Sequence, residues 1–358
     1  MNTRKVSGAI YMLTIICLCW LLAGCSARPE AAEADHDIKE DDLIVVGFSQ
    51  VGSESYWRNV NTESMQSVFT KENGYKLIFE NAQQKQTNQI TAIRSFIQRD
   101  VDYIVLAPVV ETGWDTVLSE AKEAGIPVII VDRQVDVSDD SLFTCWVGSD
   151  FELEGSLVCM WMSKYFNMHG ISASSIHIAD IQGTLGSSAQ IGRTKGFQHM
   201  SRLYGWDVVA YEEGEFTKSK GKEAMSQILA KSDNVNVVYC ENDSEALGAI
   251  EVLEAAGKKC GSNITKGEVM LVAFDGINEE ARAKVADGKI SCIGECNPMH
   301  GPRVESIIRK LEAGETPEKY QYVTEGIFSN TSDIPSVMIS GQERTVTVIT
   351  DKDIKKSN

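Results

Sequence analysis

Residues 43–58 read LIVVGFSQVGSESYWR, and this stretch decides the fold. Its first part, residues 43–48, is a continuous apolar run, and such a run indicates a strand buried on both faces, as in a parallel sheet covered by helices. A polar segment follows directly, at residues 49–58. In open α/β sheets, ligands bind beyond the carboxyl ends of the strands, so this segment is the first place to expect a site.

The same alternation of apolar runs and amphipathic helical segments continues along the chain. In residues 88–99, for example, the apolar residues fall at helical spacing, and they do so again in residues 245–256. Strands are predicted at Leu43–Gln50, Lys76–Asn81, Tyr103–Pro108, Val128–Asp132, Ser175–Asp180, Asp207–Tyr211, Val235–Cys240, Val269–Phe274 and Ile290–Glu295. About 315 residues exceed what one core usually supports, so the pattern predicts an α/β protein with two doubly wound, Rossmann-like lobes. At Leu142–Asp150 one extended segment follows another without a helix, which marks the predicted first crossing between lobes.

The N-terminus has the layout of a secretory signal peptide. A basic start, Arg4 and Lys5, precedes an apolar stretch at residues 9–22, and small residues lead to Cys25. Leu22-Ala23-Gly24-Cys25 resembles the lipobox of bacterial lipoproteins, which implies acylation of Cys25 and a lipid-anchored protein on the outer face of the cell membrane. The alternative is an ordinary signal peptide followed by a cysteine that is never acylated.

Residues 26–42 contain seven acidic and two basic residues and almost nothing that could pack. Such a segment cannot bury enough apolar surface to order itself, so we expect a flexible spacer. Removal of Arg4 and Lys5 with the signal leaves 32 basic against 51 acidic residues, a net charge of −19 for the mature chain. This charge argues against nucleic acid or anionic lipid as the partner.

Polar side chains gather where the predicted strands end. Carboxylate and amide oxygens accept hydrogen bonds from sugar hydroxyls, guanidinium groups donate two at once, and an indole offers a flat face to sugar C–H groups. Each residue also has a simpler interpretation. Asp132 and Asp275 could cap a following turn or helix, Arg193 could be a solvated helix charge, and Trp57 could belong to the core.

Several segments together resemble the ribose/galactose group of periplasmic sugar-binding proteins, which serve bacterial ABC uptake systems. The matching segments are 46–55 with Trp57 and Arg58, 83–86, 107–110 with 112–114, 182–184 and 216–222. The resemblance implies the fold of a type I periplasmic binding protein, with two lobes joined by a multi-strand hinge. It extends from about Leu43 to about Pro317. It departs at Tyr56, at residues 295–298 and after Thr331.

The resemblance also implies a function. We expect a monomeric solute-binding protein that captures a monosaccharide, galactofuranose or a close aldose, and delivers it to the membrane subunits of an ABC permease. It implies no catalytic residue, no metal and no cofactor. The residues implied to contact the sugar are Glu54, Ser55, Trp57, Arg58, Asp132, Arg133, Arg193, Asn242 and Asp275. The expected domains are a signal peptide (1–24), a lipidated acidic linker (25–42), a first lobe (43–145 and 296–323) and a second lobe (146–295 and 324–350).

Three other classes compete with this interpretation. Asp132 and Asp275 could be the paired carboxylates of a glycosidase, but the chain has no G-x-S-x-G, H-E-x-x-H or P-loop motif. A sugar-responsive repressor needs a DNA-binding helix-turn-helix before the first strand, where this chain has a signal and an acidic linker. A receptor subunit that informs a membrane sensor remains an open alternative to transport.

Six cysteines remain in the mature chain besides Cys25. An even number outside the cell favours disulfides. Most of these cysteines, however, stand inside apolar strand-like or helical runs, where a thiol behaves as a small core residue. Cys292 and Cys296 are four residues apart on an extended segment, too far for a bridge. We therefore predict free thiols.

Overall fold

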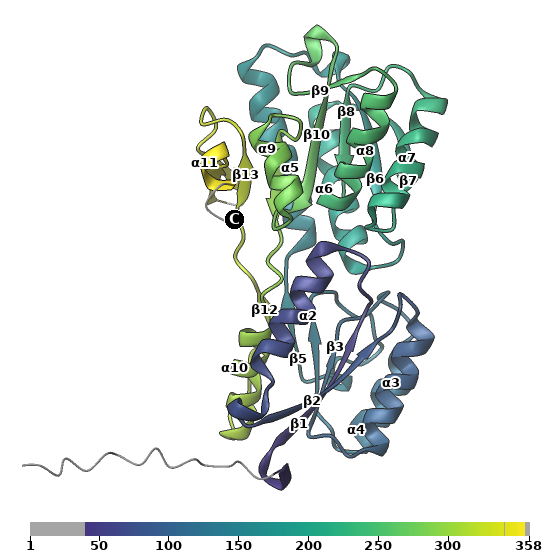
Figure 1. The fold of residues 1–358 in the computed structure, drawn as a ribbon, viewed down its shortest axis with the longest axis vertical. Helices are drawn as coiled ribbons and strands as arrows, with labels where there is room; N and C mark the ends of the chain where they lie inside the picture. Colours follow the sequence, from purple (N-terminus) through teal and green to yellow (C-terminus); the bar gives the residue numbers. More distant parts are fainter. Residues whose placement is uncertain (1–39, 340, 355–358) are drawn as a thin grey trace, which may run out of the picture. The chain divides into compact units, whose positions relative to one another are not determined.

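The structure, a computed structural model, describes residues 40–339 and 341–354 (Figure 1). The predicted signal peptide, Cys25 and nearly all of the acidic linker lie outside these residues. Among the helices of the described part, none has the length and apolar character needed to cross a membrane.

The first lobe is built on six strands, all parallel, in the order β12-β5-β4-β3-β1-β2. Helices α2 and α10 pack on one face of this sheet, and α3 and α4 pack on the other. The elements are β1 (Ile44–Gln50), α2 (Tyr56–Val68), β2 (Tyr75–Asn81), α3 (Gln86–Gln98), β3 (Tyr103–Leu106), α4 (Asp115–Glu123), β4 (Val128–Val131), β5 (Cys145–Gly148), α10 (Gly301–Glu312) and β12 (Tyr320–Tyr322).

The second lobe has a sheet in the order β14-β15-β13-β11-β10-β8-β6-β7, with β9 added beside β10. Its strands β7, β6, β8, β10 and β11 are parallel, with α5 and α6 on one face and α7, α8 and α9 on the other. The elements are α5 (Phe151–Met168), β6 (His177–Gln182), α6 (Ser188–Tyr204), β7 (Asp207–Glu213), α7 (Lys218–Lys231), β8 (Val237–Cys240), α8 (Asp243–Ala255), β9 (Lys259–Cys260), β10 (Glu268–Asp275), α9 (Glu279–Ala286), β11 (Cys292–Glu295), β13 (Ile327–Ser329), β14 (Ser336–Ile339), β15 (Gln342–Val348) and α11 (Asp351–Ile354).

The chain passes between the two sheets three times. We call these passages the hinge segments: residues 149–150 between β5 and α5, residues 296–300 between β11 and α10, and residues 323–326 between β12 and β13. Two doubly wound lobes joined by several strands are the predicted fold, which is therefore confirmed. The lobe boundary predicted after Cys145 passes through β5, and this strand stays in the first sheet as far as Gly148.

All nine predicted strands are present, with ends that differ by at most two residues. The two segments with apolar residues at helical spacing, residues 88–99 and 245–256, lie in helices α3 and α8. The prediction works because the central strands are buried along their length: β3, β4 and β8 have no exposed residue, so their sequences carry continuous apolar runs.

Candidate functional site

A small pocket lies at the carboxyl ends of the strands of both sheets. All nine residues predicted to contact a sugar line this pocket, together with four that were not predicted: Phe151, Ala189, Phe216 and Cys296.

On the first lobe, Arg58 organises the pocket wall. Its Nη1 lies 2.8 Å from Oδ2 of Asp132, and its Nε donates to Glu54 at 3.3 Å. The guanidinium group also lies over the indole ring of Trp57, 4.6 Å from the ring centre. The indole is held in turn, because Trp57 Nε1 donates to the carbonyl oxygen of Cys296 at 2.8 Å. Arg58 and Trp57 are therefore fixed in place within a buried wall.

Arg133 also faces the pocket from the first lobe. Its Nη1 donates to the carbonyl oxygen of Val109 at 2.9 Å, but its buried Nε makes no hydrogen bond within the described residues. The same holds for the buried Oε2 of Glu54. Burial lowers the pKa of Arg133 to about 10, and the nearby Arg58 charge adds to this effect. A buried cation and a buried carboxylate with unpaired atoms are costly, unless a polar ligand meets them.

On the second lobe, Arg193 occupies the corresponding place. Its Nε donates to Glu154 at 2.8 Å and its Nη2 to Asp275 at 3.3 Å, while Nη1 donates to the backbone oxygen of Glu241. Arg193 is buried and lies over the ring of Phe274, with 4.7 Å to the ring centre. The alternative of a solvated helix charge is thus wrong for Arg193.

Asp132 and Asp275 stand directly after β4 and at the end of β10, and both have left-handed backbone conformations, with φ of 65° and 83°. The helix after Asp275, α9, is capped by Asn278, and the next helical turn after Asp132, at Asp140–Leu142, is capped by Asp139. The capping alternative is therefore wrong for both aspartates. Burial raises the pKa of Asp275 to about 6, against the opposing effect of the Arg193 charge.

Asn242 and Ser55 line the pocket and also cap helices. Asn242 Oδ1 accepts from the backbone N–H of Glu245 at 2.8 Å, as part of a capping box at α8, and its Nδ2 donates to the carbonyl oxygen of Phe216 at 3.0 Å. Each end of this amide thus makes one hydrogen bond within the protein, and Nδ2 keeps a second N–H that can be donated. Ser55 Oγ accepts from Arg58 N–H at 3.2 Å, which leaves its hydroxyl proton free to be donated.

Phe216 forms an apolar wall that the sequence reasoning missed. The ring lies 5.2 Å from the Arg133 guanidinium group of the other lobe. It reaches this place only because residue 183 is glycine, since a Cβ atom there would lie 1.9 Å from the ring. The matching segments 182–184 and 216–222 contain both residues, but nothing in the sequence alone brings these loops together.

The two lobes also meet outside the pocket. The backbone N–H of Glu111 donates to the carbonyl oxygen of Gly186 at 2.9 Å, and the N–H of Gln134 donates to Oγ of Ser188 at 2.8 Å. These contacts join loops of the first lobe to the start of α6 on the second. They describe a closed arrangement in which the pocket is shut between the lobes.

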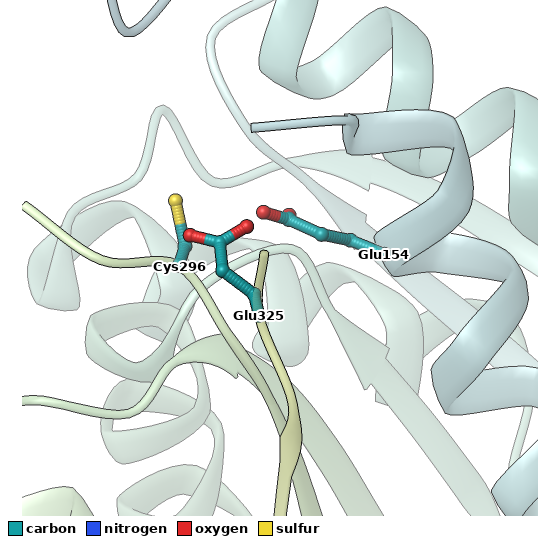
Figure 2. A group of neighbouring side chains, drawn as sticks. All are labelled: Glu154, Cys296 and Glu325. Carbon is teal, nitrogen blue, oxygen red and sulfur yellow. The ribbon is translucent and has the colours of Figure 1, made fainter. Parts of the chain in front are cut away.

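The six cysteines predicted to be free thiols are buried and free. One of them, Cys296, belongs to a cluster with Glu154 and Glu325, and Figure 2 shows the two carboxyl groups pointing toward one another beside the thiol. Among the described residues, this is the one group of three or more acidic, histidine or cysteine side chains that could hold a metal ion.

Comparison with known proteins places this fold in a family. A model of the periplasmic binding protein domain matches residues 45–298. The galactofuranose-binding protein YtfQ of Escherichia coli (strain K12) is 39% identical over 281 residues, covering 77% of this chain and 85% of that protein.

Two solved structures resemble the chain to a similar degree as each other. A Mycobacterium smegmatis protein in complex with β-D-fucofuranose is 39% identical, with a TM-score of 0.74, and the match covers 80% of this chain and 91% of that one. The binding component of the arabinose ABC transporter of Shewanella sp. ANA-3, bound to α- and β-L-arabinofuranose, is 40% identical, with a TM-score of 0.73 and the same coverage.

The architecture is therefore that of a type I periplasmic binding protein. The chain belongs to the periplasmic binding protein family, in its ribose/galactose group, as the sequence motifs predicted.

Proposed function

We propose that this protein captures one monosaccharide in its furanose form between its two lobes and presents it to the permease of an ABC uptake system. No bond of the sugar is broken. The sugar bridges the lobes, and the closed arrangement is stabilised by as much as the sugar prefers it to the open one. We further propose that the nine predicted contact residues act as the sugar site.

The observation that carries this proposal is the pairing of buried charges around one small pocket. Arg58 with Asp132 and Arg193 with Asp275 approach it from opposite lobes. Oε2 of Glu54 and Nε of Arg133 add a buried acceptor and a buried donor without protein partners in the described chain. Alternating donors and acceptors suit the neighbouring hydroxyls of a sugar, and Trp57 and Phe216 offer faces for its C–H groups.

The names of the relatives support the furanose form. One is named for galactofuranose, one was solved with fucofuranose and one with arabinofuranose. Fucose is 6-deoxygalactose and arabinose is a pentose, so these sugars differ mainly beyond the ring. We infer that the pocket recognises the furanose ring and that galactofuranose or a close aldose is its ligand.

The test is calorimetry of the mature protein with D-galactose, D-fucose, L-arabinose and D-ribose, together with galactose derivatives locked as furanose or pyranose. We expect one sugar per chain, binding of the furanose-locked derivative and no binding of the pyranose-locked one. A ligand at about 100 times its Kd should also raise the free energy of unfolding by about 2.7 kcal/mol. Binding of the pyranose-locked derivative alone would overturn the furanose assignment, and the absence of heat with every aldose would overturn sugar binding.

We also propose that Cys25 carries the lipid that anchors the protein to the outer face of the membrane. The signal layout and Leu22-Ala23-Gly24-Cys25 support this. The variant Cys25→Ser should be released from the membrane or remain an uncleaved precursor. Equal membrane attachment of the variant and the wild type would contradict the anchor.

A further inference from the structure

Glu154 lies at the start of α5, between the pocket and the hinge. Its Oε2 accepts from Nε of Arg193 at 2.8 Å, and the carboxyl group otherwise meets the Glu325 carboxyl group and the Cys296 thiol. Glu325, on the third hinge segment, lies opposite. One oxygen of each carboxyl group and Sγ of Cys296 all lie within 4.8 Å of one another (Figure 2).

Glu325 connects all three hinge segments. Its Oε1 accepts from Oγ of Ser149 on the first segment at 2.9 Å and from the backbone N–H of Asn297 on the second. Glu325 itself lies on the third. The position of its carboxyl group therefore depends on how the three segments are arranged.

Two facing carboxylates cannot donate to each other, and their charges repel in a buried site, where the Cys296 thiol beside them is only a weak donor. A single proton removes the repulsion and supplies the missing donor. We propose that Glu154 is a positioning residue for sugar binding, whose carboxyl group holds Arg193 in the pocket on one side and shares one proton with Glu325 of the hinge on the other. This inference rests on the proposed sugar-binding function.

Burial supports the same picture. It raises the pKa of Glu154, with the Arg193 charge opposing it, and it raises the pKa of Glu325 well above its usual range, with the Glu154 charge adding to the effect. The other charged or titratable groups that face the pair are Arg193 from α6, Asp275 from β10, Cys296 at the second hinge segment and Arg303 from α10.

The direction of the pH dependence follows from these raised values. A group whose pKa is raised in the folded protein contributes its stabilisation fully below its ordinary value and loses it as the pH rises through the raised value. Loss of the shared proton should push the two carboxylates apart and displace Arg193. Sugar affinity should therefore fall as the pH rises, by up to about tenfold per pH unit for one linked proton.

The test compares sugar affinity between about pH 5 and about pH 9 for the wild type, Glu325→Gln and Glu295→Gln, with the furanose-locked galactose derivative. The amide group that Glu325→Gln introduces would donate permanently to Glu154, so this variant should lose most of the pH dependence and bind more tightly than the wild type at high pH. Glu295 is the matched control, since its Oε2 accepts from the backbone N–H of Gly326 at 3.0 Å. Its variant should show a pH profile parallel to that of the wild type.

A pH profile of Glu325→Gln that parallels the wild type would overturn the inference. So would a wild-type affinity that is independent of pH, a result that needs no variant to fold. A further measurement compares sugar affinity with and without added Zn²⁺, after the protein has been treated with a chelator. Tighter sugar binding with Zn²⁺ would mean that Glu154, Cys296 and Glu325 hold a metal ion instead of a proton. If no sugar binds at any pH, the proposed function fails, and that result is distinct from all of these.

Discussion

Arg58 of the first lobe and Arg193 of the second each pair with an aspartate that stands in a left-handed conformation at a strand end. The surroundings of the two arginines differ. Arg58 is held by Gln50, Glu54 and Asp132, all near the pocket in its own lobe. Arg193 is held by Glu154, which also faces the hinge. The comparison indicates that the same pair of arginine and aspartate serves both lobes and that their links to the hinge differ. Arg193 reaches it through the carboxyl group of Glu154, whereas Arg58 reaches it only through the indole of Trp57, which donates to the backbone of Cys296.

Replacing the arginines should produce the largest effects. Arg58→Ala and Arg193→Ala each leave two buried carboxylates without their cation, so we expect the free energy of unfolding to fall by about 3–5 kcal/mol and sugar affinity to fall more than about a hundredfold. The measurements are urea unfolding and calorimetry, with the exposed Arg202→Ala on the same helix as control. If residual sugar affinity is measurable, its dependence on pH should differ from that of the wild type only in the Arg193 variant. Equal pH dependence in both variants would contradict the difference between the two arginines.

Replacing the two aspartates of the pocket should have the next largest effect on sugar affinity. Asp132→Asn and Asp275→Asn each weaken a charged hydrogen bond to the sugar, and we expect affinity to fall by about tenfold to a hundredfold. The exposed Asp287→Asn serves as control in calorimetry. An affinity loss in one variant alone would restrict sugar recognition to one lobe.

Asp275 should also affect stability in a pH-dependent way. Its pKa is raised to about 6, so its contribution to stability is fully present below its ordinary value and is lost as the pH rises through about 6. Unfolding measured at a series of pH values should show Asp275→Asn gaining stability relative to the wild type over that range. A constant difference between the two proteins would contradict the raised pKa.

A smaller effect should come from the apolar wall that the second lobe adds. Gly183→Ala places a Cβ atom against the Phe216 ring, so we expect about 1–3 kcal/mol of destabilisation and a displaced ring. Affinity should fall by about tenfold or less. Adding Phe216→Ala to this variant should restore part of the stability and none of the affinity. Destabilisation that persists in the double variant would mean that the overlap with Phe216 is not its cause.

The smallest effect on affinity should come from Asn242. Each end of its side chain already makes one hydrogen bond within the second lobe, and only a second N–H remains for the sugar. Asn242→Ala should therefore lower the free energy of unfolding by about 1 kcal/mol and weaken binding by only about threefold. Ser55→Ala on the first lobe removes a cap as well as a free hydroxyl donor, and we expect it to weaken binding more, by about fivefold. A larger loss of affinity in Asn242→Ala than in Ser55→Ala would show that Asn242 exchanges its hydrogen bonds to the protein for hydrogen bonds to the sugar.

The residues in and beside the pocket show which parts of the site the sequence could predict and which it could not. Asp132, Asp275 and Arg58 were identified because they follow continuous apolar strands, and parallel topology brings strand ends to one edge. Phe216 was missed, since its place depends on Gly183, on a loop distant in the sequence. Glu325 was missed for a related reason: its neighbour Glu154 is 171 positions away, and no local pattern links the start of a helix to a late hinge segment.

The central claim is that one furanose touches charged pairs from both lobes at once, and a crystal structure of the protein with galactofuranose tests it most directly. We expect one sugar in the pocket, with hydrogen bonds to Arg58 or Asp132 from the first lobe and to Arg193 or Asp275 from the second. A sugar that contacts the charged residues of one lobe alone, or that binds outside this pocket, would contradict the claim.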